Sequence, residues 1–337
     1  MSAGCPQIPH EFSFDPAYGF SIEGLRTIRH TGEEPKGFDV FWRSLRRKAD
    51  LHPRGVSFRE LPSPHAGVRL LEVRYAVWPG YWVGAWVRLP ENPADVCGVR
   101  VVGHGYSGRE SPDEEPANPR HLTIFPVAPG FGISRNPGIP SDSAALHVVH
   151  GIENPETYIL GSCVSALWGA LDVAEVLLGR PVVGAHYVGW SFGGGLGALM
   201  LPWESRFASA ELGQPTFGNH PFRLSVPCVG SGESVRQKFL RDPGIAQALA
   251  YYDAAFAVRR LRIPVVFACA RFDPAVPPPG QFTVANECGS LKFISEFLVG
   301  HFDFHHPAEA DELAHHRKNL DQMQNAVSGS EKAPSLP

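Results

Sequence analysis

Residues 186–195 read HYVGWSFGGG, and this stretch decides the fold. The apolar run before Ser191 is typical of a strand, and the glycines after it open a helix. A Gly-x-Ser-x-Gly pattern between a strand and a helix indicates a sharp turn that lifts a serine hydroxyl clear of the sheet. Gly189 and Gly193 are needed because a side chain at either position would collide with the neighbouring strand or helix. The pattern makes Ser191 a candidate nucleophile, and the alternative is a glycine-rich turn with an incidental serine.

Candidate partners for Ser191 follow it in chain order, each at the end of a later apolar run. Asp273 follows residues 264–270, and His301 follows residues 291–298. Because open α/β sheets gather their sites at the carboxyl ends of the strands, we expect both side chains beside the serine. Asp273 would then orient the imidazole of His301, which would take the serine proton and later return it to the leaving group. Each residue alone is more often a cap or a loop residue, but their joint order and placement favour a triad.

Short apolar runs alternate with helical patterns from residue 99 onward, which predicts a mostly parallel sheet wound on both faces. Before that point, residues 68–77 and 83–89 alternate between apolar and polar side chains on either side of a Pro-Gly turn. They predict an antiparallel hairpin with one solvated face. The expected divisions of the chain are an N-terminal extension (1–36), an α/β domain (37–326) and a polar tail (327–337).

The same patterns give the expected elements of the domain. The runs expected as further strands are 99–103, 122–127, 186–190, 208–212, 264–270 and 291–298. The runs expected as helices are 38–48, 158–178, 235–240, 246–260, 281–288 and 307–326.

The composition is that of an ordinary globular protein, with 43% hydrophobic and 19% charged residues. A formal net charge of −4 gives no reason to expect nucleic acid or an anionic membrane as a partner. We expect no membrane span, because no apolar run reaches about 18 residues, and no export signal stands at the N-terminus. The six cysteines are scattered without a Cys-x-x-Cys pair, so a reducing, cytoplasmic location is expected rather than disulfides or metal binding.

Residues 104–106 read His-Gly-Tyr and follow the apolar run 99–103. A second backbone donor for a developing oxyanion comes from this position when a Gly-x-Ser-x-Gly turn is catalytic. We therefore expect an oxyanion hole formed by the backbone N–H groups of Phe192 and Tyr106. Loss of one such donor costs on the order of 3 kcal/mol in the transition state. An ordinary glycine turn is the alternative.

Histidines near the end of the chain suggest a metal site. His305 and His306 stand close to His301, but adjacent histidines point in different directions and no second cluster completes a site. We therefore expect no metal. His147 and His150 precede a long helical run with no matching carboxylate, and we expect both in a loop.

Several segments in the right order resemble the acetyl xylan esterase and cephalosporin C deacetylase group, carbohydrate esterase family seven. The segments are GFDVFW (37–42), HGYSGR (104–109), GIENPETY (151–158), YDAA (252–255) and DPAVPP (273–278). The resemblance covers nearly the whole chain after the N-terminal extension and implies the α/β-hydrolase fold. It implies the family's nucleophile, acid and base at Ser191, Asp273 and His301, and a backbone oxyanion donor at Tyr106.

Three positions depart from the family pattern. Residues 129–132 read Pro-Gly-Phe-Gly where the family usually has Arg-Gly-Gln, Phe302 stands in place of a usual Glu, and Phe192 replaces a usual Gln. These changes make the surroundings of the expected triad more apolar, so we expect Phe131 and Phe302 to contact substrate. Members of the family form hexamers, so a homo-oligomer is also compatible with the sequence.

These observations together predict a serine esterase with no cofactor that acts on a small-molecule ester. It would remove acetyl or other short acyl groups from acetylated carbohydrate or a related compound, through an acyl-serine intermediate. An esterase for longer or aromatic acyl groups is one alternative, and a non-catalytic binding protein that keeps the scaffold is another. A peptidase of this fold normally needs a propeller or a cap, and about 100 residues before the core are too few for a propeller.

Overall fold

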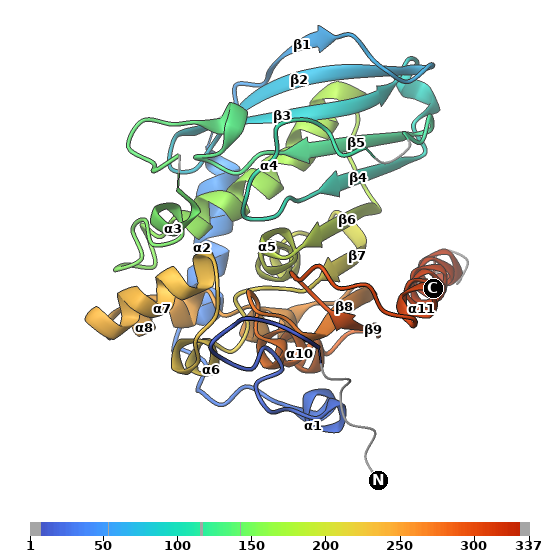
Figure 1. Ribbon diagram of the computed structural model, residues 1–337. Coiled ribbons are helices and arrows are strands. Elements are labelled where there is room, and N and C mark those ends of the chain that lie inside the picture. The colour runs from blue at the N-terminus through green and yellow to red at the C-terminus, as the bar shows by residue number, and fades with distance from the viewer. Residues whose placement is uncertain (1–7, 53, 115–116, 142, 331–337) are drawn as a thin grey trace, which may run out of the picture.

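The computed structural model describes residues 8–52, 54–114, 117–141 and 143–330. One nine-stranded sheet runs through the molecule in the order β1-β2-β3-β5-β4-β6-β7-β8-β9 (Figure 1). The strands are β1 (Ser57–Leu61), β2 (Val68–Val77), β3 (Tyr81–Pro90), β4 (Gly98–Val102), β5 (His121–Pro126), β6 (Ala185–Trp190), β7 (Phe207–Gly213), β8 (Val265–Phe272) and β9 (Lys292–Val299). From β5 across to β9 the neighbours are parallel, whereas β1, β2, β3 and β5 pair antiparallel. The predicted mostly parallel sheet with an N-terminal antiparallel hairpin is confirmed.

β1 is a strand that the sequence pattern does not predict. Its side chains are exposed or half-buried, because it lies at the edge of the sheet and pairs only with β2. Alternation of apolar and polar residues marks a strand only where one of its faces is buried. β1 therefore leaves no signal in the sequence.

Helices cover both faces of the parallel part of the sheet. The α-helices are α1 (Ile22–Thr27), α2 (Phe38–Leu51), α3 (Ala144–His147), α4 (Ile159–Leu178), α5 (Phe192–Met200), α6 (His220–Ser225), α7 (Ser231–Arg241), α8 (Ile245–Tyr251), α9 (Ala254–Ala257), α10 (Pro278–Glu287) and α11 (Glu309–Ser330). Short 3₁₀ turns are η1 (Pro93–Asp95), η2 (Gly132–Ser134), η3 (Leu201–Trp203) and η4 (Val258–Arg260). Successive residues of β7 point to opposite faces of the sheet: Leu212 faces α5, whereas Glu211 bonds His316 of α11. The expected winding on both faces is confirmed.

The helix expected over 246–260 is divided into α8 and α9. Asp253 lies between them, and its side chain caps α9 by accepting the N–H of Ala255 at 3.0 Å. The same carboxylate bonds His30 at 2.9 Å, so a contact distant in sequence fixes the break.

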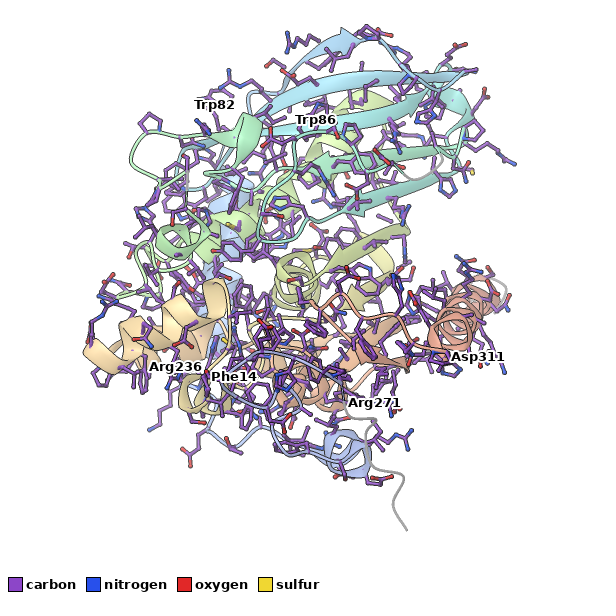
Figure 2. All side chains as sticks on the ribbon, viewed as in Figure 1. Phe14, Trp82, Trp86, Arg236, Arg271 and Asp311 are labelled. Carbon is purple, nitrogen blue, oxygen red and sulfur yellow. The ribbon has the colours of Figure 1, made fainter. Side chains whose placement is uncertain are left out.

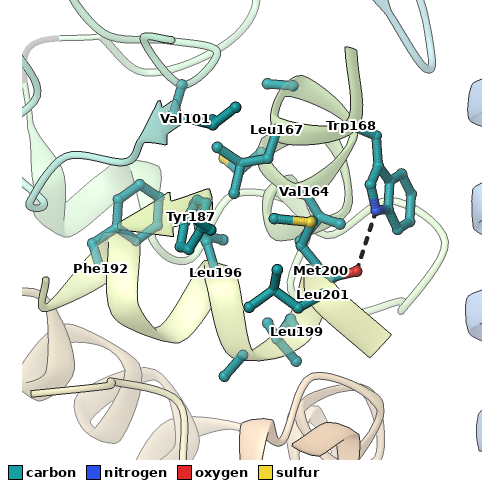
Figure 3. Packing of buried hydrophobic residues seen from close by; sticks show 14 of the residues in the cluster. Val101, Val164, Leu167, Trp168, Tyr187, Phe192, Leu196, Leu199, Met200 and Leu201 are labelled. Carbon is teal, nitrogen blue, oxygen red and sulfur yellow. Dashed lines mark hydrogen bonds between the residues drawn. The ribbon is translucent and has the colours of Figure 1, made fainter. Parts of the chain in front are cut away.

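The core is centred on α5, whose nine residues are all buried. Figure 3 shows its side chains packed against those of α4, where the indole N–H of Trp168 donates to the carbonyl of Met200 at 3.3 Å. Burying one leucine-sized side chain stabilises a fold by roughly 2 kcal/mol. α5 is therefore a rigid support for the turn that precedes it.

α4 belongs to the same core. Its 20 residues are long enough to cross a membrane, and an 18-residue stretch within it has a mean hydropathy of 1.5. However, 83% of this stretch is buried inside the protein. A helix in the interior of a large domain is apolar on all sides, which accounts for its composition.

β3 is buried on both faces. The prediction that one face of the hairpin is solvated is therefore wrong for this strand. α4 contacts it on one side. On the other side the N–H of Gly84 donates to the hydroxyl of Ser134 in η2 at 2.8 Å. Trp82 and Trp86, labelled in Figure 2, share this second face by strand alternation, and Trp86 is buried. The chain after β5 folds back over β3, and the local pattern of the strand carries no signal of that return.

The two ends of the described chain pack on the domain. α1 contacts α10, and His30 and Asp253 pair with side chains that are each only 1% exposed. At the other end, α11 continues to Ser330, past the expected helix end at residue 326. Residues 331–337 of the expected polar tail lie outside the described residues.

Candidate active site

Ser191 stands at the turn between β6 and α5 with a left-handed backbone, at φ +56°. Its N–H donates to the carbonyl of Gly213 at 2.8 Å, which holds the turn against β7. A Cβ on Gly189 would lie 2.5 Å from the Gly193 carbonyl, and a Cβ on Gly193 would lie 3.0 Å from the backbone of Gly103. The predicted need for glycine at both positions is confirmed, and it places the loop after β4 directly beside the start of α5.

The structure brings Ser191, Asp273 and His301 together from the ends of three strands. The Nδ1 atom of His301 lies 2.8 Å from Oδ2 of Asp273, and its Nε2 atom lies 2.8 Å from Oγ of Ser191. A carboxylate only accepts hydrogen bonds, so Nδ1 carries the imidazole proton and Nε2 accepts the hydroxyl proton of Ser191. This arrangement can remove the proton as the serine oxygen attacks a carbonyl carbon.

Asp273 is fully buried, and its carboxylate accepts four hydrogen bonds from described residues. Its Oδ1 accepts the N–H groups of Ala275 and Val276, both at 2.9 Å. Its Oδ2 accepts the side-chain amide of Gln281 at 2.9 Å in addition to His301. Gln281 is buried on α10, and sequence reasoning missed it because nothing in that helix distinguishes it from an ordinary core amide.

His301 combines partial exposure with a strong charge partner. Burial alone would lower its pKa, but the hydrogen bond and the negative charge of Asp273 outweigh burial and raise the pKa above its ordinary value. A Cβ on Gly300 would lie 2.7 Å from Oδ2 of Asp273, so this residue leaves room for the acid. The close approach of the two loops fixes the imidazole between the acid and the serine.

Tyr106 and Phe192, the expected oxyanion donors, lie side by side with their ring centroids 4.3 Å apart. Phe192 is the first residue of α5, so its N–H has no partner within the helix. The positive end of a helix favours negative charge at this point. The geometry brings the two residues together, and their role as donors stays a prediction.

An aromatic cluster surrounds these two residues. It consists of His104, Tyr106, Phe131, His147 and Phe192. Phe131 is buried within it, next to Tyr106 and Phe192. The expectation of a loop position for His147 is wrong, because this residue ends α3 and is fully buried.

Phe302 lies in a different place from Phe131. Its ring packs against Phe272, at 5.3 Å between centroids, and against Phe12 of the N-terminal segment, at 5.7 Å. The structure therefore does not bring Phe302 into the aromatic cluster. Contact of either phenylalanine with substrate stays a prediction.

Among the residues that the structure describes, no group of three or more His, Cys, Asp or Glu side chains is placed to hold a metal ion. His305 pairs with Glu309 at 3.3 Å, and His306 pairs with Glu312 at 3.4 Å. The two adjacent histidines thus bind different carboxylates of α11.

The fold is shared with solved esterases along nearly the whole chain. An acetyl xylan esterase from Paenibacillus sp. R4 is 19% identical with a TM-score of 0.78, over 90% of this chain and 99% of the other. Acetyl xylan esterase 1 from Thermoanaerobacterium sp. JW/SL YS485 is 18% identical with a TM-score of 0.76, over 92% of this chain and 99% of the other. These similarities establish the α/β-hydrolase fold.

The sequence itself carries a family match. The family described as acetyl xylan esterase (AXE1) matches residues 16–200, more than half of the chain. The matched part contains Ser191, Tyr106 and Phe192 and ends before Asp273 and His301. The chain therefore belongs to the acetyl xylan esterase family, a group of serine carboxylic ester hydrolases.

Proposed function

We propose that this protein removes acetyl or other short acyl groups from the hydroxyl groups of carbohydrates or related small esters. The observation that carries the proposal is the continuous line of hydrogen bonds from Asp273 through His301 to Ser191, with two contacts of 2.8 Å. Membership of the acetyl xylan esterase family supports acetyl as the acyl group and a sugar as the alcohol.

The proposed reaction proceeds through an acyl-serine. The Ser191 oxygen attacks the ester carbonyl carbon while Nε2 of His301 takes the hydroxyl proton. The oxyanion that forms accepts hydrogen bonds from the backbone N–H groups of Phe192 and Tyr106. The bond to the alcohol oxygen then breaks, and that oxygen takes the proton from Nε2. The acetyl group remains on the serine.

Deacylation repeats these steps with water. His301 takes a proton from a water molecule, whose oxygen attacks the acyl carbon of the acetyl-serine. The Ser191 oxygen leaves and recovers the proton from Nε2, so acetate is released and the enzyme returns to its starting state. Asp273 keeps its charge throughout and stabilises the imidazolium that forms in each half of the reaction.

Ser191→Ala tests this proposal. Acetate release from acetylated xylo-oligosaccharides should fall by roughly 10⁶-fold, because loss of the nucleophile removes the acyl-serine route. Ser205→Ala, a change of an exposed serine in the turn before β7, should leave the rate unchanged. A fluorophosphonate should label the unmodified protein and fail to label Ser191→Ala. Unchanged turnover in Ser191→Ala would refute the proposal, and absent labelling of the unmodified protein would favour a non-catalytic binding protein.

The acyl preference is tested separately. The buried rings of Phe131 and Phe192 leave little freedom beside the start of α5, which supports a small acyl group. We expect kcat/KM for nitrophenyl esters to fall at least about tenfold from acetate to octanoate. A rise along this series would instead support the alternative of longer or aromatic acyl groups.

We place the protein in the cytoplasm as a homo-oligomer. The five cysteines within the described residues are unpaired, which supports a reducing compartment. The family resemblance supports assembly of several copies. Light scattering of the purified protein tests the assembly, and fractionation of the source cells tests the location.

A further inference from the structure

Tyr106 is anchored through its side chain as well as its backbone. Its hydroxyl lies 2.9 Å from Nδ1 of His147, and Nε2 of His147 lies 2.8 Å from the carbonyl oxygen of Pro129. A carbonyl only accepts, so Nε2 of His147 carries the proton. Burial lowers the pKa of His147 to about 4, which keeps the ring neutral near pH 7. Nδ1 therefore accepts the hydroxyl proton of Tyr106.

A second histidine ties the same two loops together. The ring of His104 bonds the carbonyl of Gly105 through Nδ1 at 2.6 Å, and its Nε2 accepts the N–H of Ala128 at 2.9 Å. The loop after β4 is thus joined to the loop after β5 directly through His104 and indirectly through His147 of α3. Only one of the two, the bond from Tyr106 to His147, holds the side chain of an expected oxyanion donor.

The anchor matters because the backbone around Tyr106 is intrinsically free. Gly103 and Gly105 precede it and Gly108 follows it, and glycine samples more backbone conformations than any other residue. The direction of the Tyr106 N–H is set from two sides, because His104 holds the carbonyl of the same peptide group and His147 holds the Tyr106 side chain. The ring rests on Phe192 at 4.3 Å between centroids, so the same anchor sets the spacing of the two expected donors.

We propose that His147 is a positioning residue of the oxyanion hole, which it orders by holding the hydroxyl of Tyr106 and the carbonyl of Pro129. The inference rests on the proposed function. His147 touches neither substrate nor Ser191 in this assignment and acts through Tyr106. Residues 104–106 are then supported by the chain after β5. The supporting part includes residues 129–131, where the sequence departs from the family pattern.

Tyr106→Phe tests the hydrogen bond with the smallest change. It keeps the ring contact with Phe192 and removes only the hydroxyl. We expect kcat for nitrophenyl acetate to fall by roughly 10- to 100-fold, because a displacement on the order of 1 Å at a reacting centre costs about that much. KM should change by less than about threefold, because the N–H acts on the transition state rather than on the bound ester.

His147→Leu should give the same split between kcat and KM, and His147→Gln should recover most of the activity. The Gln side chain offers an acceptor for Tyr106 and a donor for Pro129, as the imidazole does. In a double-mutant cycle, Tyr106→Phe combined with His147→Leu should be no slower than the slower single variant, since both break one chain of bonds. Fully additive losses would overturn the proposal.

Matched controls separate positioning from general loss of stability. Tyr75→Phe removes another buried hydroxyl, which joins β2 to α4 by donating to the carbonyl of Ala166 at 2.8 Å. It should lower the melting temperature about as much as Tyr106→Phe and leave kcat unchanged. Inhibition by trifluoroacetone, which adds to the serine and places an oxyanion in the hole, should weaken in Tyr106→Phe and not in Tyr75→Phe.

The outcomes keep the two proposals apart. Activity that survives Ser191→Ala defeats the proposed function itself. Activity that is lost in Ser191→Ala but unchanged in both Tyr106→Phe and His147→Leu defeats only the inference about His147. If His147→Leu does not fold, Tyr106→Phe alone decides, and its unchanged kcat with unchanged trifluoroacetone inhibition would overturn the assignment.

Discussion

In the proposed mechanism the protonation of His301 decides whether the site can act, because only the neutral imidazole accepts the Ser191 proton. The pKa of His301 is raised, since the bond and charge of Asp273 outweigh the effect of burial, so protonation sets in at a higher pH than for a free histidine. We expect kcat/KM to fall as the pH drops, with a midpoint above about 6.5, the ordinary value for histidine.

Asp273→Asn checks the cause of that shift. The neutral amide removes the charge that raises the pKa and favours the wrong tautomer, so kcat should fall by about 10⁴-fold. The acid limb of the remaining activity should move to lower pH. A rate profile of nitrophenyl acetate hydrolysis measures both, and an unmoved limb in the variant would show that Asp273 does not set the pKa.

Gln281 supports the acid from behind, and Gln281→Leu should weaken both stability and catalysis. The change leaves the N–H of Ala270 without its 2.8 Å acceptor and removes one donor from Asp273. Each buried group left without a partner costs about 1–3 kcal/mol of the free energy of unfolding. We expect kcat/KM to fall roughly tenfold, since the carboxylate of Asp273 loses one of the donors that fix its orientation toward His301.

Asn286→Leu is the matched control for Gln281. It removes another buried amide of α10, one that donates to the carbonyls of Leu25 and Ile28 at 2.9 Å and does not contact Asp273. Urea denaturation should show a loss of stability in both variants. Equal losses of kcat/KM in the two variants would mean that Gln281 acts only on stability.

At the scale of elements, the N-terminal segment before α1 supports the loops that carry the acid and the base. The N–H of Asp273 donates to the carbonyl of Pro16 at 3.1 Å, and the ring of Phe12 packs on Phe302, the residue after His301. A segment with such contacts is part of the site's framework.

Phe12→Ala is therefore expected to lower kcat by about two- to tenfold, because Phe302 loses a neighbour and the His301 loop gains freedom. Phe20→Ala is the control, since the ring of Phe20 packs on Phe222 at 5.8 Å between centroids rather than on Phe302. Steady-state kinetics of the two variants give the comparison. A larger loss of kcat in Phe20→Ala than in Phe12→Ala would contradict the proposal that Phe12 supports the His301 loop through Phe302.

The elements also show where sequence reasoning succeeds and where it ends. Runs such as 264–270 and 291–298 predict strands because parallel strands are buried on both faces, and this is a local property. Two features depend on contacts distant in sequence: the break at Asp253 and the burial of His147. The bond from Gln281 to Asp273 spans only eight residues, but it depends on how the loop after β8 turns back onto α10. No local period or motif reports them. The convergence of Ser191, Asp273 and His301 was predictable because the fold fixes the order of its strand ends.

At the scale of the whole molecule, buried neutral histidines predict sensitivity to acid. Burial lowers the imidazole pKa to about 4 in each of four histidines: His104, His147, His186 and His220. The unfolded chain has a histidine pKa near 6.5, so between these values the unfolded state binds more protons than the folded state. Their contribution to stability is complete above about pH 6.5 and is lost as the pH falls toward 4.

Urea denaturation from pH 7 to pH 4 checks this expectation. Each such histidine contributes a slope of up to about 1.4 kcal/mol per pH unit. His186→Gln should reduce the total slope without touching the aromatic cluster, since His186 bonds Ser209 on the neighbouring strand. A free energy of unfolding that stays constant over this range would contradict the prediction.

The contact of Ile8 with Phe272 and Leu298 has a practical consequence for any fusion protein. A polypeptide joined ahead of this residue would emerge beside the strand ends that hold the acid and the base. It would compete for the apolar surface on which Phe12 rests. An affinity tag or a surface linker attached there is therefore expected to disturb turnover more than the same addition beyond α11.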